Sequence, residues 1–212
     1  MKSVSILDYG CGNILSLKRA VMESGLDVKF CNDEKNLIES NFLILPGVGA
    51  FENAMNLLKQ RNLIDALKEY SLIKKKPILG ICLGMQLLLT KSFEMGENQG
   101  LDIIKGANIL IKSNLKNPKF KVPHIDWEEI YFCKNLLSKN LIFKDLDRKS
   151  FYFVHSYMAS LENHENLVAY SQYHDVKIPA IIQSNNIIGC QFHPEKSGIN
   201  GLKLLESAFK LI

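Results

Sequence analysis

The sequence predicts an α/β protein with an open, mostly parallel central sheet that is flanked by helices. Apolar runs without polar alternation, such as residues 42–45 and 77–81, are typical of strands buried on both faces of a parallel sheet. Between these runs, apolar residues recur at helical spacing, so strands and helices alternate through the first half of the chain. From about residue 105, shorter strand-like runs follow one another and predict a mixed or antiparallel extension of the same sheet.

The first half of the chain should form a regular series of strands and helices. Its expected strands are Val4 to Asp8, Asp27 to Phe30, residues 42–45 and residues 77–81. Helices are expected through Ile14, Leu17 and Val21 and around Glu34 to Ser40. Two more are expected where apolar residues follow the i, i+3, i+4, i+7 spacing, first at residues 51, 54, 55 and 58 and then at residues 63, 66, 67 and 70. A further helix should begin in the apolar run Met85 to Leu89.

The second half is predicted to be richer in strands. The strand-like runs are Asn108 to Ile111, Phe151 to Val154, Val168 to Tyr173, Pro179 to Gln183 and Ile187 to Gln191. Residues 114–121 are polar and contain a proline, which indicates a surface loop, and Asn200 to Ile212 has the apolar spacing of a closing helix. No composition shift or linker divides the chain, so we expect one domain over residues 1–212.

Composition excludes several classes of function. The 26 basic and 22 acidic residues give a net charge of +4 without a basic block, which argues against a nucleic-acid partner. The apolar run near the N-terminus is too short for a signal peptide, and no run approaches the ~20 apolar residues of a membrane helix. The five cysteines are odd in number and form no C-x-x-C pair, which argues against disulfides and a zinc site. We therefore expect a soluble, cytoplasmic protein without a metal or cofactor.

The segment Gly80 to Gly84 places a cysteine between a predicted strand and a predicted helix. Its pattern G-x-C-x-G follows the logic of a nucleophile elbow, in which glycines permit a sharp turn that exposes the central side chain. The start of a helix stabilises a thiolate, so Cys82 is a candidate nucleophile. The alternative is that Cys82 is a small buried hydrophobic residue, which is the commoner situation for a cysteine between apolar residues.

A candidate base and its orienting group follow the last predicted strand, in Gln191-Phe192-His193-Pro194-Glu195. Residues two apart in an extended segment project to the same face, and Pro194 restricts the conformation of His193. Glu195 could then orient the imidazole of His193. An oriented imidazole beside a thiol is the arrangement that activates a cysteine, so the two motifs together predict a Cys82–His193–Glu195 triad.

These motifs resemble the class I, or triad, glutamine amidotransferases. Within that class, the chain resembles the glutaminase subunits of imidazole glycerol phosphate synthase. The segments that carry this resemblance are Asp8 to Asn13, Pro46 to Phe51, Gly80 to Gln86 and Tyr152 to Tyr157. A lone G-x-C-x-G would be weak evidence, whereas five blocks in the same order along the whole chain are specific. The resemblance implies hydrolysis of glutamine to glutamate and ammonia, and no cofactor.

The resemblance also implies roles for further residues. Backbone N–H groups of Leu83 and of Val48 or Gly49 would form an oxyanion hole. Gln86, Glu94, Ser156 and Tyr157 would contact the substrate, and Asn13, Asp126 and Trp127 would face a partner. We interpret His155 as structural because the triad already has its histidine. His124, His164 and His174 lie in no ligand-like spacing and are assigned no chemistry.

The implied partner is a (β/α)8-barrel cyclase or synthase that receives the ammonia within a heterodimer. Here the chain departs from its family, because the usual Pro-His-Met-Gly-Trp-Asn is replaced by Pro123 to Glu128, with Asp126 for the glycine and Glu128 for the asparagine. If both carboxylates face the partner, the partner should carry a basic patch. The leading interpretation is histidine biosynthesis, and the alternative is a paralogous glutaminase that feeds another acceptor, such as amidination of a bacterial surface sugar. Two rivals from other classes are a cysteine hydrolase of γ-glutamyl peptides and a non-catalytic scaffold.

Overall fold

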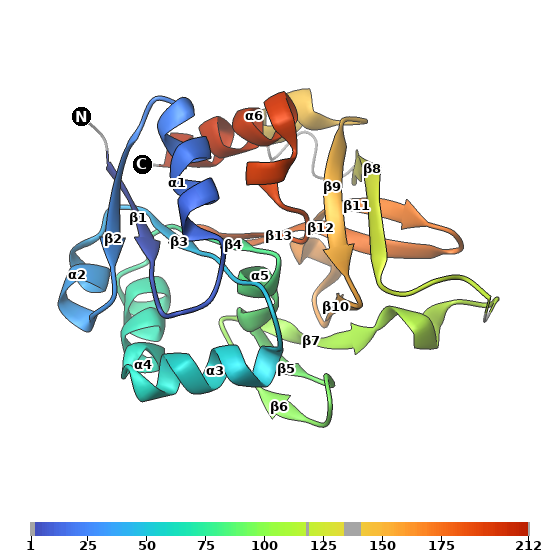
Figure 1. The fold of residues 1–212 in the computed structure, drawn as a ribbon, viewed down its shortest axis with the longest axis horizontal. Helices are drawn as coiled ribbons and strands as arrows, with labels where there is room; N and C mark the ends of the chain where they lie inside the picture. Colours follow the sequence, from blue (N-terminus) through green and yellow to red (C-terminus); the bar gives the residue numbers. More distant parts are fainter. Residues whose placement is uncertain (1–2, 118, 134–140, 212) are drawn as a thin grey trace.

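A long mixed sheet forms the centre of the molecule. The computed structural model describes residues 3–117, 119–133 and 141–211, and within these residues the main sheet has nine strands in the order β2-β1-β3-β4-β13-β12-β11-β8-β9 (Figure 1). Their bounds are β1 Ser3–Leu7, β2 Asp27–Cys31, β3 Leu43–Leu45, β4 Ile78–Ile81, β8 His124–Phe132, β9 Ser150–His155, β11 Leu167–Tyr173, β12 Val176–Ser184 and β13 Ile187–Cys190.

The sheet divides into a parallel part and an antiparallel part. Strands β2, β1, β3, β4 and β13 are parallel neighbours, and in their register Leu79 of β4 lies between Ile44 and Ile188. Strands β12, β11, β8 and β9 continue the sheet through antiparallel pairs. The predicted α/β class, with an open parallel core and a mixed extension, is therefore confirmed.

Helices cover both faces of the parallel part. The helices are α1 Ile14–Glu23, α2 Glu34–Glu39, α3 Phe51–Gln60, α4 Leu63–Lys68, α5 Leu83–Leu87 and α6 Gly198–Ala208. Figure 1 shows α1 and α6 on one side of the sheet and α3 and α4 on the other. The buried side chains of α1 and α6 pack with those of Ile44 and Leu79, whereas α3, α4 and α5 pack with Leu43, Leu45 and Ile78. Alternate residues of the same strands thus fill two separate cores, which explains their continuous apolar character.

A second, four-stranded sheet was not predicted. Its order is β10-β7-β5-β6, with bounds β5 Leu89–Ser92, β6 Asn98–Gln99, β7 Ile104–Leu110 and β10 Tyr157–Leu161. The assignment of residues 108–111 to the main sheet is therefore wrong, because residues 108–110 end β7 and residue 111 starts a short 3₁₀ helix, Ile111–Asn114. The expected helix from Met85 ends at Leu87, since residues 101–104 donate to the carbonyls of Leu87, Leu88 and Leu89 that a longer helix would have used.

Other boundaries differ less. Strand β8, His124–Phe132, was missed because Asp126, Glu128 and Glu129 interrupt its apolar residues, and it pairs with β9 along most of its length. Helix α6 starts at Gly198, two residues earlier than predicted, and is followed by a 3₁₀ turn, Phe209–Leu211, while residue 212 lies outside the described residues. Among the described residues, no helix is long and apolar enough to cross a membrane.

Candidate functional site

Cys82 lies on a sharp turn between β4 and α5. Its backbone angles, φ 51° and ψ −108°, are rare for a residue with a side chain, and its N–H donates to Cys190 O at 2.8 Å. The two glycines of the elbow are required by close packing. A Cβ atom on Gly84 would lie 1.8 Å from Leu45 O, and one on Gly80 would lie 2.8 Å from Gly84 O. The local sequence therefore allows α5 to pack tightly against β3 and β4 while Cys82 occupies the turn.

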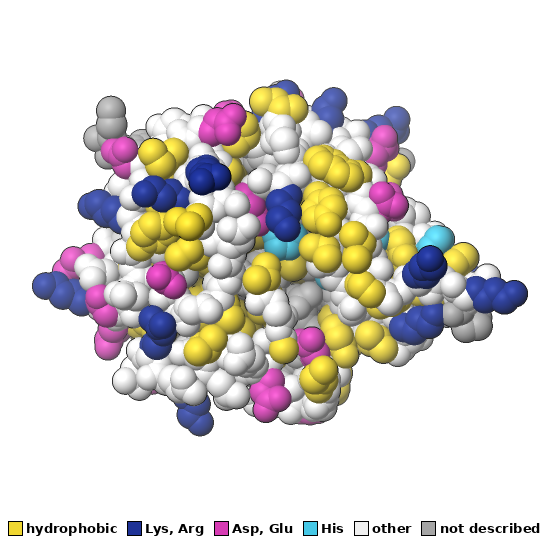
Figure 2. All heavy atoms as spheres, in the orientation of Figure 1, with side chains coloured by type: hydrophobic (Ala, Val, Ile, Leu, Met, Phe, Trp, Pro, Cys, Tyr) yellow, Lys and Arg dark blue, Asp and Glu magenta, His cyan; other side chains and the backbone are white. Residues whose placement is uncertain are grey.

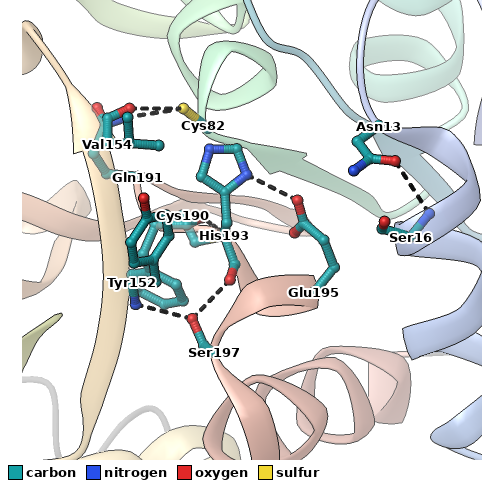
Figure 3. Close-up of polar contacts among 11 residues, drawn as sticks. Asn13, Ser16, Cys82, Tyr152, Val154, Cys190, Gln191, His193, Glu195 and Ser197 are labelled. Atoms are coloured by element: carbon teal, nitrogen blue, oxygen red, sulfur yellow. Dashed lines mark hydrogen bonds and ion pairs between the residues drawn. The ribbon is translucent and has the colours of Figure 1, made fainter. Parts of the chain in front are cut away.

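His193 and Glu195 follow β13, the strand next to β4. The Nδ1 atom of His193 lies 2.8 Å from Oε1 of Glu195, and Figure 3 shows the imidazole between Glu195 and the Cys82 sulfur. The backbone around His193 is fixed as well, because its N–H donates to Tyr152 O at 3.0 Å and its carbonyl accepts from Ser197 Oγ at 2.7 Å. The sequence motif thus brings these three groups together in space.

One part of the sequence argument is wrong. Glu195 does not continue an extended segment, because Pro194 begins a 3₁₀ turn, Pro194–Lys196. Proline is favoured at the first position of a helical turn, where its missing N–H is not needed. The turn brings the Glu195 carboxylate back to the imidazole of His193 by a different path from the predicted alternation.

The pKa of His193 depends on its two neighbours, Cys82 and Glu195. Burial alone would lower the pKa of His193, but its interactions with Cys82 and with Glu195 outweigh burial and raise the pKa to about 10. The ring is only 2% exposed, and its Nε2 atom makes no hydrogen bond to any described residue. His193 therefore retains its proton at neutral pH, and Nε2 is available to the sulfur and to a bound substrate.

The predicted site residues line one small cavity beside the elbow. Its volume is about 260 Å³, and its lining consists of Val48, Gly49, Cys82, Leu83, Gln86, Glu94, Val154, His155, Ser156, Tyr157 and His193. These residues come from the β3–α3 loop, the elbow, the end of β5, the end of β9 and the end of β13. The structure thus collects every residue that was predicted for the oxyanion hole and for the substrate, and Glu195 contacts His193 behind the cavity.

Two polar side chains of the cavity are held by hydrogen bonds within the protein. Gln86 on α5 donates from Nε2 to Tyr157 O at 3.2 Å and to Gln191 Oε1 at 3.1 Å. Glu94 accepts the Phe51 N–H at 2.8 Å through Oε2, so its charge also lies at the N-terminus of α3. Glu94 lies seven residues beyond the end of α5, so its carboxylate is not at the end of that helix.

Gln191 was not assigned a role from the sequence. Its side chain is buried, and Nε2 donates to the Cys82 sulfur at 3.7 Å while Oε1 accepts from Gln86. The signal available in the sequence was its position two residues before His193, at the end of the same strand.

The residues predicted to face a partner lie at the rim of the site or farther out. Asn13 is exposed and caps α1 by accepting the Ser16 N–H at 3.3 Å (Figure 3). Trp127 is 52% exposed and meets the ring of Tyr152 edge to face, with 6.1 Å between ring centroids. Figure 2 shows hydrophobic side chains gathered over the region of β8 and β9.

Strand alternation separates the two unusual carboxylates from Trp127. Asp126 and Glu128 lie on the opposite face of β8 from Trp127, together with the buried His124. They line a hollow of about 680 Å³ that is also lined by Lys112, Lys119, Lys121, Tyr173 and His174 of the same chain. Strand alternation therefore points Asp126 and Glu128 away from Trp127, towards a hollow whose lining includes basic side chains of the same chain.

Within the described residues, no three His, Cys, Asp or Glu side chains gather in a way that could hold a metal ion.

Comparison with known proteins agrees with this geometry. The family model "Glutamine amidotransferase class-I" matches residues 5–211. The chain belongs to the class I glutamine amidotransferase family. This amidotransferase is 44% identical over 207 residues to "Imidazole glycerol phosphate synthase subunit HisH" of Lactococcus lactis, with 98% of each chain covered. It is 42% identical over 208 residues to "HisH 2" of Methanococcus maripaludis, with 98% of each covered, and 39% identical over 219 residues to "HisH 1" of Legionella pneumophila, with 100% of each covered.

Solved structures show the same fold at much lower identity. This enzyme superimposes on "Structure of PurLQS from Thermotoga maritima" with a TM-score of 0.73, 18% identity and 99% of each chain covered. A structure titled "Crystal structure of glutamine amidotransferase" gives a TM-score of 0.71 at 18% identity, with 98% of this chain and 97% of that chain covered. Within the family, the sequence places this amidotransferase with the HisH subunits rather than with these distant structural neighbours.

Proposed function

We propose that this amidotransferase hydrolyses the side-chain amide of glutamine as the glutaminase subunit of imidazole glycerol phosphate synthase, in histidine biosynthesis. The observation that carries the proposal is the small cavity in which Cys82 and His193 meet Gln86, Glu94 and Tyr157. A full-length identity of about 40% to HisH subunits supports this choice of acceptor pathway over the paralogous alternative.

Catalysis would begin at the sulfur of Cys82. The protonated His193 favours the thiolate, which attacks the carboxamide carbon and forms a tetrahedral oxyanion. The C–N bond then breaks, His193 gives its proton to the departing ammonia, and a thioester remains. Water, deprotonated by the now neutral His193, hydrolyses the thioester and releases glutamate. Glu195 keeps the imidazole oriented through both steps.

The oxyanion would be stabilised by backbone N–H groups. Leu83 is the first residue of α5, where N–H groups have no acceptor inside the helix. The second donor would come from Val48 or Gly49, and Gly49 has φ +106°, a conformation open to glycine. Loss of one such donor typically costs about 2.7–4 kcal/mol of transition-state stabilisation, so the orientation of this loop could control activity.

The remaining lining residues would hold glutamine. Gln86 would contact the amide end, Glu94 would bind the α-ammonium group, and the backbone of Ser156 and Tyr157 would face the α-carboxylate. The lining thus supplies a carboxylate and backbone groups for the charged end of the substrate as well as the thiol for its amide.

We infer that the acceptor is a (β/α)8-barrel cyclase that docks over the mouth of the cavity as a heterodimer, in the cytoplasm. Val48 of the cavity lining, and Ile125 and Trp127 on β8, are exposed hydrophobic residues that a partner could cover, with exposed fractions of 46%, 55% and 52%. Asn13 and Asp126 would lie at the edges of the contact. Direct docking would pass ammonia to the cyclase before it is protonated by water.

The proposal is tested with the purified chain and the barrel subunit of the same organism. Glutamine hydrolysis should be slow for the chain alone and faster with the barrel subunit, and the pair should make imidazole glycerol phosphate from glutamine. Rapid hydrolysis by the chain alone would contradict the coupling. A barrel protein that binds and stimulates hydrolysis without forming the imidazole product would refute the histidine assignment in favour of another acceptor.

A further inference from the structure

Two buried histidines lie against each other between the cavity and the outer end of β8. His155 ends β9 and is 7% exposed, and His124 begins β8 and is fully buried. Their rings face across the strand pair, with 3.1 Å between Nδ1 of His124 and Nε2 of His155. The mechanism above uses neither ring, and two buried imidazoles in contact need a physical explanation.

Their hydrogen bonds fix the position of each proton. Nδ1 of His155 lies 2.8 Å from Tyr157 O, and a carbonyl can only accept, so His155 must be protonated at Nδ1. Burial lowers the pKa of His155 to about 3, so its Nε2 carries no proton and accepts. His124, whose pKa burial lowers to about 4, must then be protonated on Nδ1 as well. Both rings are therefore held in the Nδ1–H form, which is the less favoured tautomer of free histidine in water.

The chain of hydrogen bonds continues to the nucleophile. Tyr157 O accepts from His155 and also from Nε2 of Gln86, whose second N–H goes to Gln191 Oε1 at 3.1 Å. Gln191 in turn donates to the Cys82 sulfur at 3.7 Å. Because both N–H bonds of Gln86 are used inside the protein, its Oε1 is the atom that remains for a ligand. An acceptor in that place suits the N–H group of a carboxamide and repels a carboxylate.

We propose that His124 and His155 are positioning residues that set the selectivity of the cavity for glutamine over glutamate. His124 donates to His155, and His155 donates to the Tyr157 carbonyl and holds it in place. That carbonyl accepts from Gln86 Nε2 and so fixes which way the Gln86 amide points, which leaves its Oε1 as an acceptor for the substrate's NH₂ group. The inference rests on the proposed function, because it concerns how the same cavity recognises its substrate. A reversed Gln86 amide would present an N–H group instead, and this N–H group could donate to a glutamate carboxylate as readily as to the amide oxygen of glutamine.

The first test uses the unmodified chain and needs no partner. In ¹⁵N-detected NMR of the histidine-labelled protein at pH 7, the signals of His124 and His155 should both show Nδ1–H and an unprotonated Nε2. Assignment uses the variants described below. A proton on Nε2 of either ring would break the chain of hydrogen bonds and overturn the proposal.

The second test measures binding through protection of Cys82 from iodoacetamide, read by peptide mass. Glutamine should protect Cys82 at lower concentration than glutamate, and His124→Leu should reduce this preference about tenfold, the usual effect of one lost hydrogen bond to a positioned group. His124→Asn places an amide N–H where Nδ1–H was and should restore the preference. Tyr173→Phe is the matched control. The Tyr173 ring packs on His124 with 4.1 Å between ring centroids, but its hydroxyl donates to Lys121 O and not to the histidine pair.

The outcomes separate the two hypotheses. If glutamine does not protect Cys82 even in the unmodified chain, the proposed function fails. If glutamine protects, but the glutamine-to-glutamate preference is the same in His124→Leu and Tyr173→Phe, the role of the histidine pair is overturned while the proposed function stands. A preference that falls in His124→Leu and returns in His124→Asn supports the positioning role, since a merely structural defect would weaken binding of both amino acids alike.

Discussion

His193 and His155 line the same cavity and are buried to a similar extent, yet their pKa values are shifted in opposite directions. The pKa of His193 is raised to about 10, whereas the pKa of His155 is lowered to about 3. Burial disfavours the charged form of both rings. The difference comes from their partners, because His193 contacts a thiol and a carboxylate, and His155 contacts a carbonyl and another neutral imidazole.

The comparison shows that one cavity holds two kinds of histidine chemistry. A cationic ring beside Cys82 can favour the thiolate and deliver a proton. A neutral ring with a fixed tautomer can orient a carbonyl without competing for that proton. Variants of Cys82, Glu195 and His155 each change one side of this contrast and should leave the other side unchanged, and a variant of Glu94 tests the same cavity away from both rings.

Cys82→Ala should have the largest effect. Removal of the sulfur eliminates the nucleophile, so glutamine hydrolysis with the barrel partner should fall by about 10⁴-fold or more. The side chain is small and 7% exposed, so the fold should persist. The check is ammonia release at saturating glutamine. Cys133→Ala is the matched control, and residual activity above one per cent in Cys82→Ala would exclude Cys82 as the nucleophile.

Glu195→Gln should have the next largest effect, because it removes the charge that faces Nδ1 of His193 while keeping a similar shape. The pKa of His193 should fall, and hydrolysis should decrease by about 10²–10⁴-fold, as when a triad loses its orienting carboxylate. The pH dependence of Cys82 alkylation gives an independent measurement. Its profile should shift in Glu195→Gln and stay the same in Glu165→Gln, which changes an exposed carboxylate. Equal profiles in both variants would contradict the role of Glu195.

The chemistry of the site could be predicted from the sequence because its requirements are local. A cysteine between two glycines after an apolar strand, and a histidine fixed by the following proline, each specify a backbone geometry within a few residues. The histidine pair and Gln191 could not be predicted in this way. Gln191 meets Gln86 across 105 residues of sequence, and His124 meets His155 across 31 residues, so only strand pairing brings them together.

The elements of the fold were likewise predictable where the local sequence specifies them and not where distant residues do. The parallel strands β3, β4 and β13 were predicted because burial on both faces makes them continuously apolar. Strand β8 was missed because charged residues at its exposed positions interrupt the apolar pattern. The second sheet was missed because the hydrogen bonds that end α5 come from residues 101–104, beyond the local sequence. Features specified by distant hydrogen bonds are the ones that required the structure.

Glu94→Gln tests the proposed contact with the substrate's α-ammonium group, with a smaller expected effect. The amide oxygen can still accept the Phe51 N–H at the start of α3, so stability should change little. Loss of the negative charge should weaken binding of the α-ammonium group and raise the KM for glutamine about tenfold, with kcat nearly unchanged. Glu97→Gln, in the turn that follows, is the control. A fall in kcat with unchanged KM would show that Glu94 does not bind substrate.

The smallest predicted effect is on the free energy of unfolding. Its dependence on pH has opposite directions for His193 and His155. For His193 the folded pKa is raised, so its stabilisation is present below the unfolded value of about 6.5 and is lost as pH rises towards 10. For His155 the folded pKa is lowered, so the unfolded chain binds the extra proton and stability is lost as pH falls below about 6.5.

His155→Asn isolates the second contribution, because asparagine can still donate to Tyr157 O but does not titrate. Between pH 7 and pH 5.5 the unmodified chain should lose about 1 kcal/mol more unfolding free energy than this variant, since one proton per molecule is worth about 1.4 kcal/mol per pH unit. Urea unfolding at the two pH values measures the difference, and His164→Asn, at an exposed position, is the control. If His155→Asn and the unmodified chain lose the same free energy, His155 is not held neutral in the folded protein. The contrast with His193 would then have no basis.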